Sequence, residues 1–523
     1  MTNTPEYPPA SPPSTPPTGA NGTGSPRRPR AALISAGGGV AAVLALAAAC
    51  SITDAASSSD TGHDGTPAEG PADELTTVDP DTIPGLEEES TTEDDGVPVA
   101  YSYPVIPNAD PLAERLSEIA EREADAFVGA VPDAADFSID WQISAAGDGV
   151  IAVRLTQAET DSEGERAGYA TYWYDTSDGH TGASTELLAG NAELAELDTL
   201  VRTALEDSGD VDTSAIRPVA RLYDSMGFNP DGDLVVEFDE GQVAPADSGR
   251  IRAVVPEDDA APLLSAYGER AQEAAVVVTP DFEVSAPPTD GEDHPPAPGT
   301  SPGAGEEDVD CAAADSKCVA LTFDDGPGAR TGEVLDALAE HDAKATFFVT
   351  GGPIREHPEF VRRTFAEGHQ LGNHTVDHPD LATLGAGGIR TQLNPVNDLV
   401  YRETGLTMDL MRPPYGSTGP TVEEVTRDLG QAQILWSVDT RDWKDRDSEK
   451  VADRAVSGAE PGAIILMHDI HDSTVDAVPE IVQRLDEQGY TMVTVSQLLG
   501  ETEPGNVYRD GAPDPEDGGE DAN

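Results

Sequence analysis

The chain has 523 residues, of which only 37% are hydrophobic, and its formal net charge is −69. Such acidity excludes a general nucleic-acid-binding protein, which needs clustered positive charge to displace counterions, and a protein held on a membrane surface by basic residues. The length leaves room for two or three domains.

The first 50 residues indicate export. Residues 1–30 are rich in Pro, Ser, Thr and Gly, and we expect them to be disordered. The segment 31–50 is apolar, follows basic residues and ends in small residues before Cys50, as secretory signals do. Its end, Ala-Leu-Ala-Ala-Ala-Cys, resembles a bacterial lipoprotein box, which implies that Cys50 is lipidated. The alternative is an uncleaved N-terminal anchor that spans the membrane. Both interpretations place the rest of the chain outside the cytoplasm, anchored to the bacterial cell membrane.

Two segments of different character follow. Residues 51–98 are dominated by Ser, Thr, Asp, Glu and Gly, which predicts a disordered acidic stalk. Residues 99–284 combine helical spacing at 112–127 with several strand-like runs, which predicts an α+β module. Within it, residues 228–245 resemble the extracytoplasmic domain of lysozyme-sensing anti-sigma factors. That resemblance implies a wall-associated module that binds lysozyme or another wall ligand.

The C-terminal half predicts a separate domain. Residues 285–310 form a Pro- and Gly-rich linker, and residues 501–523 form an acidic tail that we expect to be disordered. Between them, residues 311–500 alternate strand-like runs with helical stretches. This alternation predicts an α/β fold in which parallel strands, wrapped by helices, form a closed or nearly closed barrel. Cys311 and Cys318 lie just before the first strand and could close a small loop by a disulfide in an oxidising compartment.

Polar clusters follow several of these strands, where ligand sites of α/β sheets form. Asp324 and Asp325 end the first strand, and because adjacent side chains on an extended backbone diverge, two roles are predicted rather than one. His374 and His378 are near enough to share one metal ion. Taken singly, each cluster is also compatible with a solvated turn. The other clusters are Arg412-Pro-Pro-Tyr-Gly, Asp439-Thr-Arg-Asp-Trp and Leu466-Met-His-Asp.

The five clusters together, in this order, resemble the polysaccharide deacetylases with a NodB homology domain, carbohydrate esterase family 4. The resemblance covers about residues 316–500. It implies the family's distorted (β/α) barrel, preceded here by the smaller α+β module. It also implies a metal-dependent hydrolase that removes N-acetyl groups, which are linear amides, from a polysaccharide.

The resemblance assigns a metal site and a base. Asp325, His374 and His378 would hold a divalent metal, with Zn²⁺ as the first choice and Co²⁺ and Mn²⁺ as alternatives. Asp324 would be the general base, and Arg412 would orient it.

The same resemblance assigns the rest of the site. His468 would be the general acid, with Asp439 as its carboxylate partner. The backbone N–H at Tyr415 would contribute to the oxyanion site, and Trp443 and Leu466 would wall the acetyl pocket.

Three functions remain open from the sequence. The first is a wall-anchored deacetylase that acts on peptidoglycan. The second differs only in substrate: chitin oligomers, poly-N-acetylglucosamine or O-acetylated xylan, which the motifs do not separate. The third belongs to another class, a wall-binding or lysozyme-sensing surface protein. No nucleic-acid partner is expected.

Overall fold

A computed structural model describes residues 66–511, apart from 69, 95, 285–296, 301–308 and 314–315. These residues belong to one compact unit of the chain, Gly62–Asn523. The predictions for residues 1–50, including lipidation at Cys50, lie outside the described residues. In the part that is described, no helix has both the length and the apolar character needed to cross a bilayer.

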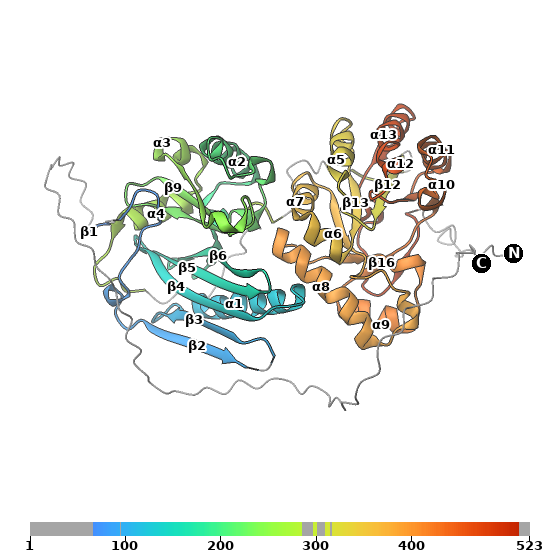
Figure 1. The fold of residues 1–523 in the computed structure, drawn as a ribbon. Helices are drawn as coiled ribbons and strands as arrows, with labels where there is room; N and C mark the ends of the chain where they lie inside the picture. Colours follow the sequence, from blue (N-terminus) through green and yellow to red (C-terminus); the bar gives the residue numbers. More distant parts are fainter. Residues whose placement is uncertain are drawn as a thin grey trace, which may run out of the picture. The chain divides into compact units, whose positions relative to one another are not determined.

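A six-stranded sheet forms the base of the α+β module (Figure 1). Its strand order is β2-β3-β4-β5-β6-β7, and all neighbours are antiparallel except β3 and β4, which helix α1 connects. Apolar side chains of α1 pack against β4 in a core that includes Leu116, Phe127 and Phe137. The bounds are β2 Glu87–Glu93, β3 Val99–Val105, α1 Asp110–Ala130, β4 Asp136–Gly147, β5 Val150–Asp161, β6 Gly164–Asp175 and β7 Thr181–Ala183.

A second layer of the module packs on the other side of this sheet's C-terminal strands. Its three-stranded sheet, in the order β10-β9-β8, shares a core with helices α2 and α4 and with Trp173 of β6. The bounds are α2 Asn191–Leu205, β8 Ser225–Phe228, β9 Leu234–Phe238, β10 Ile251–Val255 and α4 Ala266–Val276.

The folded module begins earlier than the sequence predicts. The disordered stalk expected at 51–98 is wrong for residues 87–93, which form β2 and pair with β3 along its whole length. Glu88 accepts a hydrogen bond from Trp141 Nε1 at 3.1 Å, and Glu89 accepts one from the Tyr103 hydroxyl at 3.0 Å. An acidic strand is tolerated here because it lies at the edge of the sheet, where charge also blocks further pairing.

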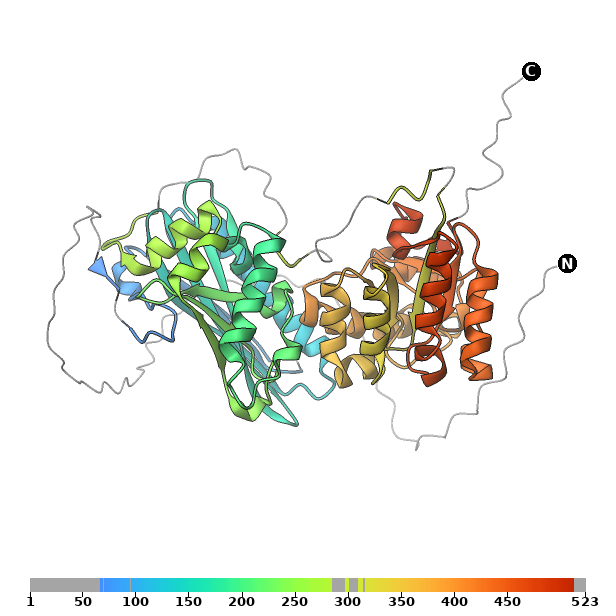
Figure 2. The same cartoon turned by 90° about the horizontal axis from the view of Figure 1, so that it is seen from above.

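The C-terminal part is a curled parallel sheet (Figures 1 and 2). Its order is β17-β18-β12-β13-β14-β15-β16-β20, with β19 paired to β12, and every pair among these strands is parallel. All residues of β12 are buried, which explains why its sequence is a continuous apolar run rather than an alternation. The bounds are β12 Cys318–Asp324, β13 Ala345–Val349, β14 Gln370–Asn373, β15 Leu410–Met411, β16 Ala432–Ile434, β17 Val438–Asp439, β18 Ile464–Met467, β19 Thr491–Met492 and β20 Val507–Tyr508.

Helices cover this sheet. In Figure 2 the yellow and the red helices lie on either side of the strands of the C-terminal part. The helix bounds are α5 Thr331–Ala339, α6 Gly351–Glu356, α7 Pro358–Ala366, α8 Ala386–Thr404, α9 Pro420–Asp428, α10 Asp442–Asp445, α11 Ser448–Gly458, α12 Asp472–Val475, α13 Val478–Glu487 and α14 Val495–Leu499.

The prediction of a disordered acidic tail at 501–523 is wrong for its first residues, because β20 pairs with β16, and Asp510 forms an isolated bridge with Ala463.

Two further features tie this part to the chain before it. A disulfide joins Cys311 to Cys318, the first residue of β12. Helix α8 forms two ion pairs with the α+β module. Asp398 accepts a hydrogen bond from Arg122 at 2.9 Å, and Arg402 donates to both carboxylate oxygens of Glu159 at 2.7 and 2.8 Å.

Candidate active site

The carboxyl ends of β12, β14, β15 and β18 lie at one edge of the parallel sheet, and each is followed by a residue that the sequence singled out. Asp324 ends β12, His374 follows β14, Arg412 follows β15 and His468 follows β18. Residues far apart in the sequence are therefore brought together because their strands are parallel neighbours.

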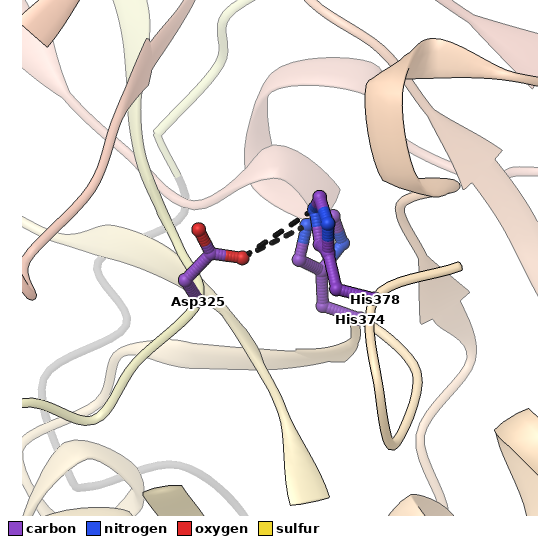
Figure 3. Close-up of side chains that lie close together, drawn as sticks. All are labelled: Asp325, His374 and His378. Carbon is purple, nitrogen blue, oxygen red and sulfur yellow. Dashed lines mark ion pairs between the residues drawn. The ribbon is translucent and has the colours of Figure 1, made fainter. Parts of the chain in front are cut away.

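The two adjacent carboxylates share one partner, His374, and differ in the other. Asp324 is buried, and its Oδ1 accepts a hydrogen bond from Arg412 Nη1 at 2.7 Å. Asp325 has a φ of 72°, which turns its side chain away from the strand direction. Its Oδ1 lies 3.6 Å from His374 Nε2 and 3.5 Å from His378 Nε2 (Figure 3). Asp324 Oδ2 also lies 3.7 Å from His374 Nε2, so His374 faces both carboxylates, whereas Arg412 bonds to Asp324 and His378 faces Asp325.

Asp325, His374 and His378 form a candidate metal centre. One ligand atom from each lies within 4.8 Å of the other two. His374 Nδ1 donates to the carbonyl of Arg412 at 2.7 Å, so its Nε2 carries the lone pair that faces Asp325. Burial lowers the pKa of His374 to about 3, which keeps the imidazole neutral, as a ligand must be. Two imidazole nitrogens and one carboxylate fit a divalent ion of the zinc type and leave coordination positions for water and substrate.

Arg412 is fixed from several sides. Its side chain is fully buried and also donates to Thr322 Oγ1 at 2.8 Å and to the carbonyls of Ile434 and Leu435 at 3.1 and 3.2 Å. With all these bonds in place, the guanidinium has little freedom to move away from Asp324. Burial raises the pKa of Asp324, and the charge of Arg412 opposes that rise. Such a carboxylate is held in one orientation and is more basic than a solvated one.

His468 pairs with Asp442 and not with Asp439. His468 Nδ1 donates to Asp442 Oδ1 at 2.8 Å, and the His468 backbone N–H donates to Asp442 Oδ2 at 2.7 Å. Thr474 Oγ1 donates to the same Oδ2 at 2.7 Å. Although burial opposes it, the hydrogen bond to Asp442 raises the pKa of His468 to about 9. His468 is therefore cationic at neutral pH and able to donate a proton.

The prediction that Asp439 is the partner of His468 is wrong for this geometry. Asp439 ends β17 and accepts a hydrogen bond from the backbone N–H of Arg441 at 2.8 Å. Arg441 has a φ of 56°, and this left-handed residue turns the chain so that Asp442 begins α10 beside β18. Both carboxylates belong to the same short motif, so the sequence contains the correct residue but no signal that selects it.

The three residues expected to contact substrate differ in their surroundings. Tyr415 has a φ of 60° and is 50% exposed as a residue, and its ring lies edge-on to His378 with centroids 4.6 Å apart. Leu466 is buried in β18, where it pairs with Thr322 of β12. Trp443 is half-buried and follows Asp442 in α10. Of these, the structure places Tyr415 against a histidine of the candidate metal centre.

The carboxyl edge of the parallel sheet thus joins two imidazoles and a carboxylate, and an Arg–Asp pair and a His–Asp pair lie beside them. Groups of these kinds serve acid–base chemistry in hydrolases. A family model described as polysaccharide deacetylase matches residues 312–434. The chitooligosaccharide deacetylase of Rhizobium leguminosarum bv. trifolii is 34% identical over 207 residues, which cover 37% of this chain and 96% of that protein. The chain belongs to the polysaccharide deacetylase family.

Other relatives extend beyond the matched part. The peptidoglycan-N-acetylglucosamine deacetylase PgdA of Listeria monocytogenes is 42% identical over 187 residues, covering 36% of this chain and 40% of PgdA. The peptidoglycan-N-acetylmuramic acid deacetylase PdaC of Bacillus subtilis is 41% identical over 194 residues, covering 37% of this chain and 40% of PdaC. The chain thus matches less than half the length of these two relatives. A solved structure described as T48 deacetylase with substrate is 44% identical and covers 38% of this chain and 99% of its own, with a TM-score of 0.37.

Proposed function

We propose that the protein is a metal-dependent hydrolase that removes N-acetyl groups from a cell-wall polysaccharide, with peptidoglycan as the substrate. The observation that carries the proposal is the convergence of Asp325, His374 and His378 beside Asp324, which Arg412 holds separately. Support also comes from relatives whose names specify peptidoglycan deacetylases.

The candidate metal centre would supply electrophilic chemistry. A divalent ion held by Asp325, His374 and His378, with Zn²⁺ as the first choice and Co²⁺ or Mn²⁺ as alternatives, would acidify a bound water and polarise the acetyl carbonyl. The neutral state of His374, enforced by burial, suits this role.

The protein's own residues would move the protons. Asp324 accepts the proton of the attacking water, and Arg412 holds the carboxylate in the orientation needed for that transfer. His468, kept protonated by Asp442, donates a proton to the leaving amine. The backbone N–H of Tyr415 donates to the carbonyl oxygen as charge develops there, while Trp443 and Leu466 enclose the acetyl methyl group. Acetate and an amino sugar are the products.

The substrate is tested by comparing four acetylated polysaccharides. Purified peptidoglycan, chitin oligomers, poly-N-acetylglucosamine and acetylxylan should be incubated with the full chain, and released acetate and the product sugars measured. We expect acetate and glucosamine or muramic acid residues from peptidoglycan. Faster release from chitin oligomers would reassign the substrate, in line with the relatives named chitooligosaccharide deacetylases. If none of the four substrates releases acetate, the proposed deacetylase activity is overturned and a wall-binding protein is favoured.

We also propose a location at the cell surface. The N-terminal segment at 31–50, as a lipoprotein signal or a spanning anchor, would hold the protein on the outer side of the bacterial membrane. The α+β module would then contact lysozyme or another wall ligand. Both statements rest on the sequence alone.

A further inference from the structure

The segment that carries both histidines is conformationally unusual. Residues 374–378, here called the histidine segment, contain two residues other than glycine with positive φ: Thr375 at 71° and His378 at 54°. A β-branched residue in this region is a strong outlier. Such a backbone persists only where the surrounding structure holds it in place.

Gln392 of helix α8 holds the middle of the histidine segment. The backbone N–H of Val376 donates to the Gln392 carbonyl at 3.0 Å, and that of Asp377 donates to Gln392 Oε1 at 3.0 Å. In return, Gln392 Nε2 donates to Asp377 Oδ2 at 3.1 Å. One residue thus satisfies two consecutive backbone donors between the two histidines.

Asn397, also on α8, holds the start of the segment through Asn373. The fully buried Asn373 side chain accepts from the Thr375 N–H at 2.8 Å, while its Nδ2 donates to Asn397 Oδ1 at 2.8 Å and to the Leu393 carbonyl at 2.8 Å. Asn397 Oδ1 also accepts from Gln431 Nε2 at 2.9 Å. Because two acceptors face Asn373 Nδ2, the amide cannot turn over without losing its bond to Thr375.

Pro395 interrupts the hydrogen-bond pattern of α8 beside these contacts. It has no N–H to donate to the carbonyl of Thr391, one turn earlier. The carbonyls of Gln392 and Leu393, the next two along the helix, accept from the histidine segment and from Asn373.

We propose that Gln392 and Asn397 are positioning residues of the metal centre: they hold the histidine segment in the shape that directs His374 and His378 toward Asp325. The inference rests on the proposed function in so far as these histidines bind a metal. Neither residue belongs to the five motifs, and neither supplies a ligand atom. Their effect is indirect, through the backbone that carries the ligands.

The test is metal affinity in the full chain, measured as Co²⁺ binding by visible absorption and by competition with a chelator. Loss of a residue that orients metal ligands weakens binding by roughly 10- to 100-fold. We expect a weakening of about tenfold or more for Asn397→Ala and Gln392→Ala, with a changed Co²⁺ spectrum. Asn397→Asp keeps an acceptor oxygen for Asn373 and should restore most of the affinity and the parent spectrum.

Asp398→Asn is the matched control. Asp398 is the next residue on α8 but pairs with Arg122 of the α+β module, so its substitution perturbs the same helix without touching the histidine segment. We expect the control to bind Co²⁺ as the parent does. Circular dichroism establishes that each variant is folded, and if Asn397→Ala is not, Gln392→Ala at its half-buried position decides the matter.

The outcomes separate the two proposals. Parent-like affinity in both alanine variants, or an equal loss in Asp398→Asn, overturns the positioning roles. A parent chain that binds no Co²⁺ overturns both the positioning roles and the proposed function. A parent chain that binds Co²⁺ in the expected way but releases no acetate overturns the proposed function alone.

Discussion

The pairing of His468 with Asp442 makes a quantitative prediction about pH. The perturbation is Asp442→Asn, which removes the negative charge that holds His468 in its cationic form. A general acid must be protonated, so activity falls as the pH rises through its pKa. With the pKa of His468 at about 9, that fall should begin well above neutral pH in the parent protein.

The size of the effect follows from the protonated fraction. At pH 8 a His468 with a pKa of about 9 is roughly 90% protonated, whereas one with the ordinary value of 6.5 is roughly 3% protonated. Burial of His468 pushes its pKa lower still once the carboxylate is gone. Asp442→Asn should therefore lower kcat/KM at pH 8 by roughly 30-fold or more, and the loss should become smaller as the pH falls.

The assay is the pH profile of acetate release, with thermal melting as a check on folding. Asp439→Asn is the matched control, because Asp439 lies in the same motif but accepts from the Arg441 backbone instead. We expect its alkaline limb to coincide with that of the parent. If Asp439→Asn shifts the limb and Asp442→Asn does not, the pairing seen in the structure is refuted and the prediction made from the motif stands.

Three further predictions concern the metal ligands and the cysteines. Asp325→Ala should lose metal in elemental analysis, with partial recovery in excess metal, whereas Asp324→Asn should keep its metal and lower turnover by roughly 10²- to 10⁴-fold; the opposite pattern would reverse the two roles. Cys50→Ala should abolish incorporation of labelled fatty acid, and equal labelling of both proteins would instead favour a spanning anchor. Unreduced peptides from the exported protein should show Cys311 bonded to Cys318, and the pairing is refuted if mass spectrometry finds two free thiols.

The curled parallel sheet was predictable because its signal is local and repeated. The first strand expected in this part, which leads into Asp324, is β12, Cys318–Asp324. Buried parallel strands give continuous apolar runs, and helices between them give a 3.6-residue period. By contrast, β2 at 87–93 has an acidic composition that resembles a linker. Its strand conformation comes from pairing with β3, which no local pattern reports.

Part of the candidate site could likewise be predicted from local sequence. Residues that follow parallel strands meet at one edge of the sheet, so the motifs indicated that Asp324, Asp325, His374 and His378 lie together. The choice of Asp442 over Asp439 depends on one left-handed residue, Arg441, whose conformation the sequence does not reveal. The sequence contains no motif for the residues outside these clusters that contact the histidine segment.

Gln392 and Asn397 illustrate that last limit. Both lie in a helix, and their functional contacts are hydrogen bonds to residues 15 to 24 positions earlier in the chain. Asn and Gln in a half-polar helix are compatible with many environments. Pro395 within an otherwise continuous helical stretch is unusual, but it does not indicate which residues contact the site.

The disulfide gives the chain a local covalent ring with a topological consequence. Cys311 and Cys318 are seven positions apart, and the disulfide connects them covalently in addition to the peptide backbone between them. A protease that cuts one bond inside this ring leaves both fragments covalently joined until a reductant is added. A cut anywhere in the preceding linker, by contrast, severs the covalent connection between the α+β module and the curled parallel sheet at once. Two nicks a few residues apart would therefore differ in whether that sheet remains attached to the N-terminal half of the chain.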